Sequence, residues 1–415
     1  MIILKTIEEW AAFDVSEAAF PWLYLQQKWI RSIGVRKEPF MNNKVKVLVV
    51  DDSSLFRQAL IQHLSSQPGI EVIGYAINAY DAKQKIPQLK PDVLTLDVEM
   101  PGLNGIEFLK QLLPTNPLPV VLVSSLNLSV FVALSAGAVD FVRKPDMTVR
   151  NSKETFFESL TVKVMTAAKA KVRISQPGAA TPNSPAPAPA PVPTPAMAGG
   201  AVRPLAPQGT ARPMPFPALS RNVLDSTIIG LGASTGGTEA TLEVLKRLPG
   251  NIPGIVITQH MPEGFTEMYA QRLNRICNME VREAKNGDVI HPGLALIAPG
   301  AKQMEVVRSG RNYIVQCRPG AKVSGHCPSV DVLFNSIAAN VAINKVGIIM
   351  TGMGRDGEDG LLKMRQNGAF TIGQDKDSCV VYGMPMVAYN IGAVCTQASC
   401  ENISNVLMNH LKGVK

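Results

Sequence analysis

Apolar runs that end in polar residues recur along the chain and predict a series of buried β-strands. In the N-terminal half, V-K-V-L-V-V is followed by Asp51 and Asp52, and D-V-L-T-L-D ends in Asp97. Two further runs are P-V-V-L-V-S-S, which has Ser124 near its end, and V-D-F-V-R-K-P, which has Lys144 near its end. Helical patterns separate these runs, so we expect a doubly wound parallel sheet whose polar strand ends meet at one edge.

Three carboxylates and a lysine gathered at one sheet edge indicate a site for a hard cation and an anion. Mg²⁺ prefers a few carboxylates together with phosphate oxygens. The alternative is that the aspartates only cap separate helices. We favour the cation site, because the joint spacing of these residues is hard to reach by chance.

The C-terminal half shows the same alternation and predicts a second doubly wound, Rossmann-like α/β domain. Its first apolar strand, I-I-G-L-G-A, leads to Ser234 at the mouth of a glycine turn. The flank from Gly232 to Gly236 fits the G-x-S-x-G nucleophile elbow, and helix N–H groups beyond it favour developing negative charge. The alternative is a phosphate loop, since Gly230-x-Gly232-x-x-x-Gly236 resembles a dinucleotide fingerprint. That fingerprint usually has an acidic residue after the next strand, whereas G-I-V-I-T-Q-H ends in His260.

The chain has five histidines, so the candidates for a general base are few. His260 alone follows an apolar strand, the next in order after the serine strand. The carboxyl edge of an open α/β sheet is where ligands bind. The other four lie in a helical pattern (His63), before a Pro-Gly turn (His291), in the polar loop G-H-C-P-S (His326) and in an amphipathic C-terminal helix (His410).

An acid is expected on a third strand end. The loop T-G-M-G-R-D-G, which follows the strand V-G-I-I-M, carries Asp356, with Asp331, Asp359 and Asp375 as possible substitutes. A serine hydroxyl is a weak nucleophile until a base takes its proton, and the acid holds the base in one tautomer. The chain order Ser, His, Asp differs from the Ser, Asp, His order of α/β-hydrolases.

The same glycine-rich loop is suited to stabilise an oxyanion. Glycines let backbone N–H groups turn toward a ligand, and an oxyanion needs fixed donors about 2.7–3.1 Å away. We therefore expect the N–H of Met353 to face Ser234, aided by Thr235. The alternative is that these glycines only make a tight strand-to-helix turn.

Proline usage divides the chain into two folded parts. Residues 177–217 contain 13 of the 31 prolines, a composition typical of an extended polyproline II spacer. A length of 415 residues is compatible with two or three domains. We expect an N-terminal extension at 1–40, a first domain at 41–165, a Pro/Ala-rich linker at 166–222 and a second domain at 223–415.

Composition excludes several classes of protein. The net charge is +8, but no helix-turn-helix or aromatic-basic stripe accompanies it, so we expect no nucleic-acid partner. No apolar run reaches the length of a membrane span, and the first residues lack a secretory signal. The six cysteines show no metal-ligand spacing and indicate reduced thiols. A cytoplasmic protein that is not membrane-embedded is expected.

The N-terminal strand ends resemble those of the response-regulator receiver family. The resemblance implies that Asp97 is phosphorylated and that Mg²⁺ is bound there, by Asp51, Asp52, Asp97 and the backbone carbonyl of Glu99. It also implies that Ser124 and Lys144 contact the phosphoryl group and that Phe141 is the switch aromatic. One departure is the segment after Ser125, which is about one helical turn shorter than in the family.

The second half resembles chemotaxis protein-glutamate methylesterases over most of residues 226–396. The motifs G-A-S-T-G-G, Q-H-M-P, I-A-P-G, H-C-P-S-V-D-V-L-F, T-G-M-G-R-D-G and V-V-Y-G-M-P-M occur in the family's order. The resemblance implies Ser234 as nucleophile, His260 as base and Asp356 as orienting acid, with no cofactor in this domain. Departures are Cys327 in place of an arginine and the pair Lys376-Asp377 in place of an acidic and a small residue.

Together these features predict a phosphorylation-activated hydrolase for adaptation in bacterial chemotaxis. It would demethylate glutamate methyl esters of methyl-accepting chemoreceptors and deamidate particular receptor glutamines, with a chemotaxis histidine kinase as phosphodonor. Unphosphorylated, the receiver is expected to cover the Ser234 cleft. The alternative is a receiver fused to a non-catalytic nucleotide- or protein-sensing module. Residues 1–40 match neither family, which favours a start codon placed too far upstream over a docking helix.

Overall fold

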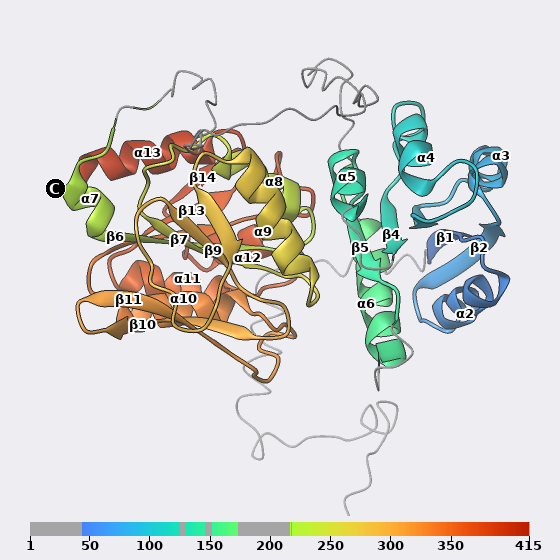
Figure 1. Cartoon of the computed structure of the whole chain (residues 1–415). Coiled ribbons are helices and arrows are strands. Elements are labelled where there is room, and N and C mark those ends of the chain that lie inside the picture. The colour runs from blue at the N-terminus through green and yellow to red at the C-terminus, as the bar shows by residue number, and fades with distance from the viewer. Residues whose placement is uncertain (1–43, 125–128, 146–151, 173–215, 217, 415) are drawn as a thin grey trace, which may run out of the picture. The chain divides into compact units, whose positions relative to one another are not determined.

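The structure is a computed structural model that describes residues 44–124, 129–145, 152–172, 216 and 218–414. The expected N-terminal extension and most of the Pro/Ala-rich linker lie outside these ranges. The described residues form two α/β domains, shown from blue to green and from yellow-green to red in Figure 1. No helix in the described part of the chain is long and apolar enough to cross a lipid bilayer.

The first domain is built on a five-stranded parallel sheet. Its strands are β1 (Val45–Val50), β2 (Ile70–Ala76), β3 (Val93–Asp97), β4 (Val120–Ser124) and β5 (Asp140–Arg143), in the order β2-β1-β3-β4-β5. Its helices are α2 (Ser54–Ser65), α3 (Ala79–Leu89), α4 (Gly105–Leu112), α5 (Ser129–Ser135) and α6 (Ser152–Ala167). Strands β3 and β4 are buried along their whole length, which explains their continuous apolar runs.

Alternate residues of β1 enter two different cores, so the sheet is covered on both faces. Val47 and Val49 pack with residues of α2 and α6. Leu48 and Val50 pack with residues of α3 and α4. Successive side chains of a strand point to opposite faces, so this division is the one that a doubly wound sheet requires.

The second domain is built on a seven-stranded parallel sheet. Its strands are β6 (Thr227–Ala233), β7 (Gly254–Gln259), β8 (Glu280–Glu283), β9 (Leu294–Ile297), β12 (Asn344–Ile349), β13 (Phe370–Gln374) and β14 (Thr396–Ala398), in the order β14-β13-β12-β6-β7-β9-β8. An antiparallel hairpin of β10 (Gln303–Ser309) and β11 (Asn312–Arg318) stands apart from this sheet.

Helices cover both faces of the second sheet as well. They are α7 (Arg221–Asp225), α8 (Gly237–Leu245), α9 (Phe265–Ile276), α10 (Val330–Asn340), α11 (Glu358–Gln366), α12 (Met384–Asn390) and α13 (Ile403–Gly413). Ile229 and Leu231 of β6 share a core with α8, α9 and α13, whereas Ile228 shares one with α10, α11 and α12. The predicted fold class, two doubly wound parallel-sheet domains, is therefore confirmed.

The strand order of the second sheet reverses at β6, and this reversal positions the candidate site. The chain runs from β6 to β7 on one side and returns to β12 on the other. In open α/β sheets, ligands bind beyond the carboxyl ends of the strands at such a switch point. The loops that follow β6, β7 and β12 carry Ser234, His260 and Asp356.

Candidate functional site

Ser234 stands in a tight turn between β6 and α8. Its N–H donates to the carbonyl of Thr351 at 3.0 Å, and its own carbonyl accepts from the N–H of Gly237 at 2.7 Å and from Nε2 of Gln259 at 2.8 Å. The left-handed backbone conformation of the turn falls on Gly236, with φ +75°, where a glycine is needed. The turn fixes the serine backbone and leaves its side chain partly exposed.

His260 joins the serine to an acid. Its Nδ1 lies 3.0 Å from Oγ of Ser234, and its Nε2 lies 2.7 Å from Oδ2 of Asp356. A carboxylate only accepts hydrogen bonds, so Nε2 must carry the proton in the resting state. Nδ1 then holds a free lone pair toward the serine hydroxyl, as a general base requires.

Asp356 is buried and is held by the first turn of α10. Oγ of Ser329 donates to its Oδ1 at 2.7 Å, the N–H of Val330 donates to its Oδ2 at 2.7 Å, and the N–H of Asp331 donates to its Oδ1 at 3.1 Å. Burial alone would raise the pKa of Asp356. The hydrogen bond and positive potential of His260, with the donors at Ser329 and Val330, outweigh burial and hold that pKa below its usual value. A negative charge at a helix N-terminus is favourable as well.

The three alternative acids take other positions. Asp331 is buried beside Asp356, but its carboxylate accepts from the N–H of Gly360 and from Oγ of Ser324. Asp359 is exposed in the first turn of α11. Asp375 accepts from the backbone and side chain of Ser378. In the described structure, Asp356 is the carboxylate bonded to the His260 ring.

The loop after β12 lies directly against the serine. A Cβ on Gly352 would lie 2.7 Å from Cβ of Ser234 and closer still to Sδ of Met384. The backbone N–H groups of Thr235 and Met353 donate no hydrogen bond to any described residue.

Two features of the site escaped the sequence analysis. The start of α10 was not expected to hold the acid, although P-S-V-D carries a Ser N-cap signal that could have placed a helix start there. His326 was assigned to a polar loop. It does lie in the loop between β11 and α10, and its ring stacks on that of His260, with the centroids 3.7 Å apart and the planes 11° apart.

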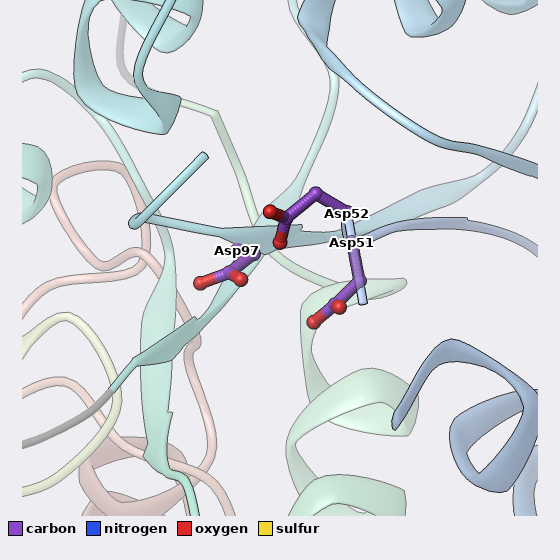
Figure 2. Close-up of side chains that lie close together, drawn as sticks. All are labelled: Asp51, Asp52 and Asp97. Carbon is purple, nitrogen blue, oxygen red and sulfur yellow. The ribbon is translucent and has the colours of Figure 1, made fainter. Parts of the chain in front are cut away.

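The first domain contains the expected acidic cluster. Asp51 and Asp52 follow β1, Asp97 ends β3, and one carboxylate oxygen from each lies within 4.8 Å of the others. Figure 2 shows the three carboxyl groups close together at these strand ends. Nζ of Lys144 lies 2.7 Å from Asp97 and 3.4 Å from Asp51.

Burial dominates the electrostatics of this cluster. It raises the pKa of Asp51 to about 6, against the attraction of Lys144 and with help from the negative charge of Asp97. Burial also raises the pKa of Asp97, although the ammonium of Lys144 opposes the shift. For Lys144, burial lowers the pKa, but the hydrogen bond to Asp97 and the negative charges of Asp97 and Asp51 outweigh burial and leave the pKa raised.

The donor set of the cluster fits a magnesium ion beside a phosphoryl group. Oδ2 of Asp51 is buried and accepts no hydrogen bond from a described residue, and Lys144 meets it only as an ion pair. Oγ of Ser124 is also buried, without a hydrogen-bond partner among the described residues. The N–H of Glu99 donates to Asp97 at 3.1 Å, which places this residue beside the cluster. Buried polar atoms normally have partners, so these two oxygens are positioned for groups other than protein.

Fold and site together define a doubly wound α/β domain that carries a hydrogen-bonded Ser-His-Asp set, preceded by a doubly wound domain with an acidic cluster at its strand ends. Two family models match the chain in the same order: the response regulator receiver domain over residues 47–171 and CheB methylesterase over residues 229–407.

Relatives of known description match the chain over most of its length. The chain is 47% identical to a protein-glutamate methylesterase/protein-glutamine glutaminase of Syntrophomonas wolfei, and the match covers 88% of this chain and 97% of that one. It is 42% identical to a protein of the same description from Salmonella typhi, with the same coverage. Among solved structures, the CheB methylesterase catalytic domain of Thermotoga maritima matches with 32% identity and a TM-score of 0.43, over 44% of this chain and 97% of that one. The chain belongs to the CheB family of protein-glutamate methylesterases/protein-glutamine glutaminases.

Proposed function

We propose that Ser234, His260 and Asp356 form the catalytic triad of this methylesterase. The observation that carries the proposal is the chain of contacts from Oγ of Ser234 through both ring nitrogens of His260 to the buried Asp356. Nδ1 of His260 takes the hydroxyl proton while Oγ attacks the ester carbonyl carbon. Asp356 holds the ring in place and stabilises the imidazolium that forms.

The tetrahedral intermediate needs donors for its negative oxygen. We assign this role to the N–H groups of Thr235 and Met353, which donate to no described residue. As the intermediate collapses, the bond from carbon to the methoxy oxygen breaks and His260 returns its proton to the departing methanol. Water then attacks the acyl-serine, and the Ser234 hydroxyl is restored as the carboxylate is released.

The substrates that we assign to this site are glutamate methyl esters on methyl-accepting chemoreceptors. The same acyl-serine forms from a glutamine side chain when ammonia leaves in place of methanol, so deamidation of particular receptor glutamines needs no further group. We place this activity in the cytoplasm, with no nucleic-acid partner and without insertion into a membrane. It serves adaptation in bacterial chemotaxis.

The first domain is the control element of the proposed enzyme. Asp97 accepts a phosphoryl group from a chemotaxis histidine kinase, and Ser124 and Lys144 contact that group. Asp51, Asp52, Asp97 and the carbonyl of Glu99 would hold Mg²⁺, which neutralises phosphoryl oxygens when bound. Phosphorylation shifts the population away from a state in which the receiver covers the Ser234 cleft.

Covalent labelling separates this proposal from a non-catalytic binding module. A serine-directed fluorophosphonate should attach to Ser234 in the full-length protein, because His260 activates that hydroxyl. Mass spectrometry of the digested protein locates the adduct, and His260→Ala should abolish it. Ser220, the N-cap of α7, is an internal control and should stay unlabelled. Labelling that is absent, or equal in the His260→Ala variant, would contradict the proposal.

A further inference from the structure

The face of the His260 ring carries a contact that its two hydrogen bonds do not explain. Both ring nitrogens are engaged within the plane of the ring, by Ser234 and by Asp356. These two hydrogen bonds hold Nδ1 and Nε2 in place. They only weakly resist a rotation of the ring about the line that joins the two nitrogens. The ring of His326 lies flat on one face of His260, with the centroids 3.7 Å apart, and blocks tilting toward that side.

The loop that carries His326 is held by several specific contacts. Val323 and His326 exchange two backbone hydrogen bonds of 2.9 Å around a two-residue turn. Both turn residues are left-handed, Ser324 with φ 51° and Gly325 with φ 84°, as in a type I′ turn. A serine rarely adopts this conformation, so the surrounding structure must favour it.

Gln303 of β10 fixes the same loop to the start of α10. Its Nε2 donates to the carbonyls of Ala321, at 2.9 Å, and of His326, at 3.2 Å. Its Oε1 accepts from the N–H of Ser329 at 2.8 Å, and Ser329 in turn donates to Asp356. The stacked ring and the acid of the triad are thus positioned by one connected set of hydrogen bonds.

The stacked ring is neutral at physiological pH. Burial lowers the pKa of His326 to about 4, and the nearby His260 and Lys322 act in the same direction, while Asp356 opposes them. A neutral aromatic face attracts a cation placed over it. His260 becomes such a cation when it takes the serine proton, whereas a charged ring at position 326 would repel it.

We propose that His326 is a positioning residue of the methylesterase reaction, whose flat neutral ring fixes the plane of His260 and stabilises its imidazolium in the transition state. This inference rests on the triad proposed above and adds a residue to it. It predicts an effect on kcat with little effect on KM, because the imidazolium exists in the transition state and not in the bound ground state.

Three substitutions in the full-length protein test the proposal on methylated receptor. His326→Leu keeps apolar bulk but removes the aromatic face, and it should lower kcat about tenfold, with KM changed less than about twofold. His326→Phe restores a flat uncharged ring and should recover most of the lost kcat. His410→Leu is the matched control: His410 stacks on Phe370, with the centroids 4.0 Å apart, in the second domain outside the active site. It should leave both constants unchanged.

Thermal unfolding of each variant shows whether it is folded, and Ser234→Ala is assayed alongside. A His326→Leu enzyme with normal kcat, or a His326→Phe enzyme as slow as His326→Leu, would overturn the inference. A change confined to KM would also overturn it, because it would indicate a substrate contact instead. If Ser234→Ala itself stays active, the proposed triad fails, and this outcome is distinct from a failure at His326.

Discussion

Two buried aspartates of this chain have pKa values shifted in opposite directions, and their hydrogen-bond donors explain the difference. Burial disfavours the charged form of both side chains. Asp356 meets four donors, from His260 and the start of α10, and its pKa is lowered. Asp51 accepts the N–H of Ser53 and shares Lys144 with Asp97, and its pKa rises to about 6. The protein supplies hydrogen-bond donors to both carboxylate oxygens of Asp356. Oδ2 of Asp51 accepts no hydrogen bond from a described residue and can coordinate a cation.

The raised pKa of Asp51 predicts how the metal-free receiver domain responds to pH. The folded state binds a proton on the Asp51 carboxylate more tightly than the unfolded chain does, because the pKa of Asp51 in the unfolded chain is near 3.8. The proton on Asp51 therefore stabilises the folded state. This stabilisation is fully present below pH 3.8 and is lost as the pH rises through about 6. Asp51→Asn should therefore stabilise the metal-free domain by about 3 kcal/mol at pH 7.5 and by little at pH 4.

Hydrogen–deuterium exchange of the β1 and β3 amides in the full-length protein measures this change. Asp52→Asn serves as the matched control, because Asp52 is exposed and its substitution should change exchange little at either pH. Faster exchange in Asp51→Asn at pH 7.5 would contradict the account of the cluster.

At the scale of elements, the loop after β12 offers a test of the oxyanion donors. Gly352→Ala would drive a Cβ against Ser234 and Met384, so it should lower kcat by tenfold or more, on the order of 1.4 kcal/mol. Gly354 has φ +87° and open space around its Cβ position. Gly354→Ala should cost about 1 kcal/mol of stability and leave kcat closer to normal. Steady-state kinetics of both variants measure the change in kcat, and urea unfolding measures the change in stability. Equal losses of kcat would show that the loop is only a tight turn.

Elements also explain what the sequence could and could not predict. Apolar runs located the strands, and parallel strands bring their carboxyl ends to one edge, so Ser234, His260 and Asp356 could be grouped from sequence. The first turn of α10 could not be joined to Asp356, because Ser329 and Asp356 are 27 residues apart and no periodic pattern links them. The position of His326 depends on a turn fixed by Gln303, a tertiary contact that no local pattern reveals.

At the scale of the whole molecule, the receiver half should control the esterase half. A small phosphodonor with Mg²⁺ should raise methylesterase activity of the full-length protein, because phosphorylated Asp97 favours the uncovered state. Asp97→Asn should keep the basal rate and lose the response. Release of labelled methanol, measured with and without the phosphodonor, gives both the basal rate and the response to phosphorylation. An Asp97→Asn protein that still responds would show that another site receives the signal.

Release of methanol from methyl-labelled receptor, by the full-length protein and by its Ser234→Ala variant, tests the role of the triad directly. Members of a triad act as a unit, so Ser234→Ala should reduce kcat by several orders of magnitude, on the order of 10⁴ or more, and His260→Ala should match it. Asp356→Asn should lose less, because this residue orients the base and does not react. Circular dichroism checks that each variant is folded. A folded Ser234→Ala protein that releases methanol at a near-normal rate would contradict the account.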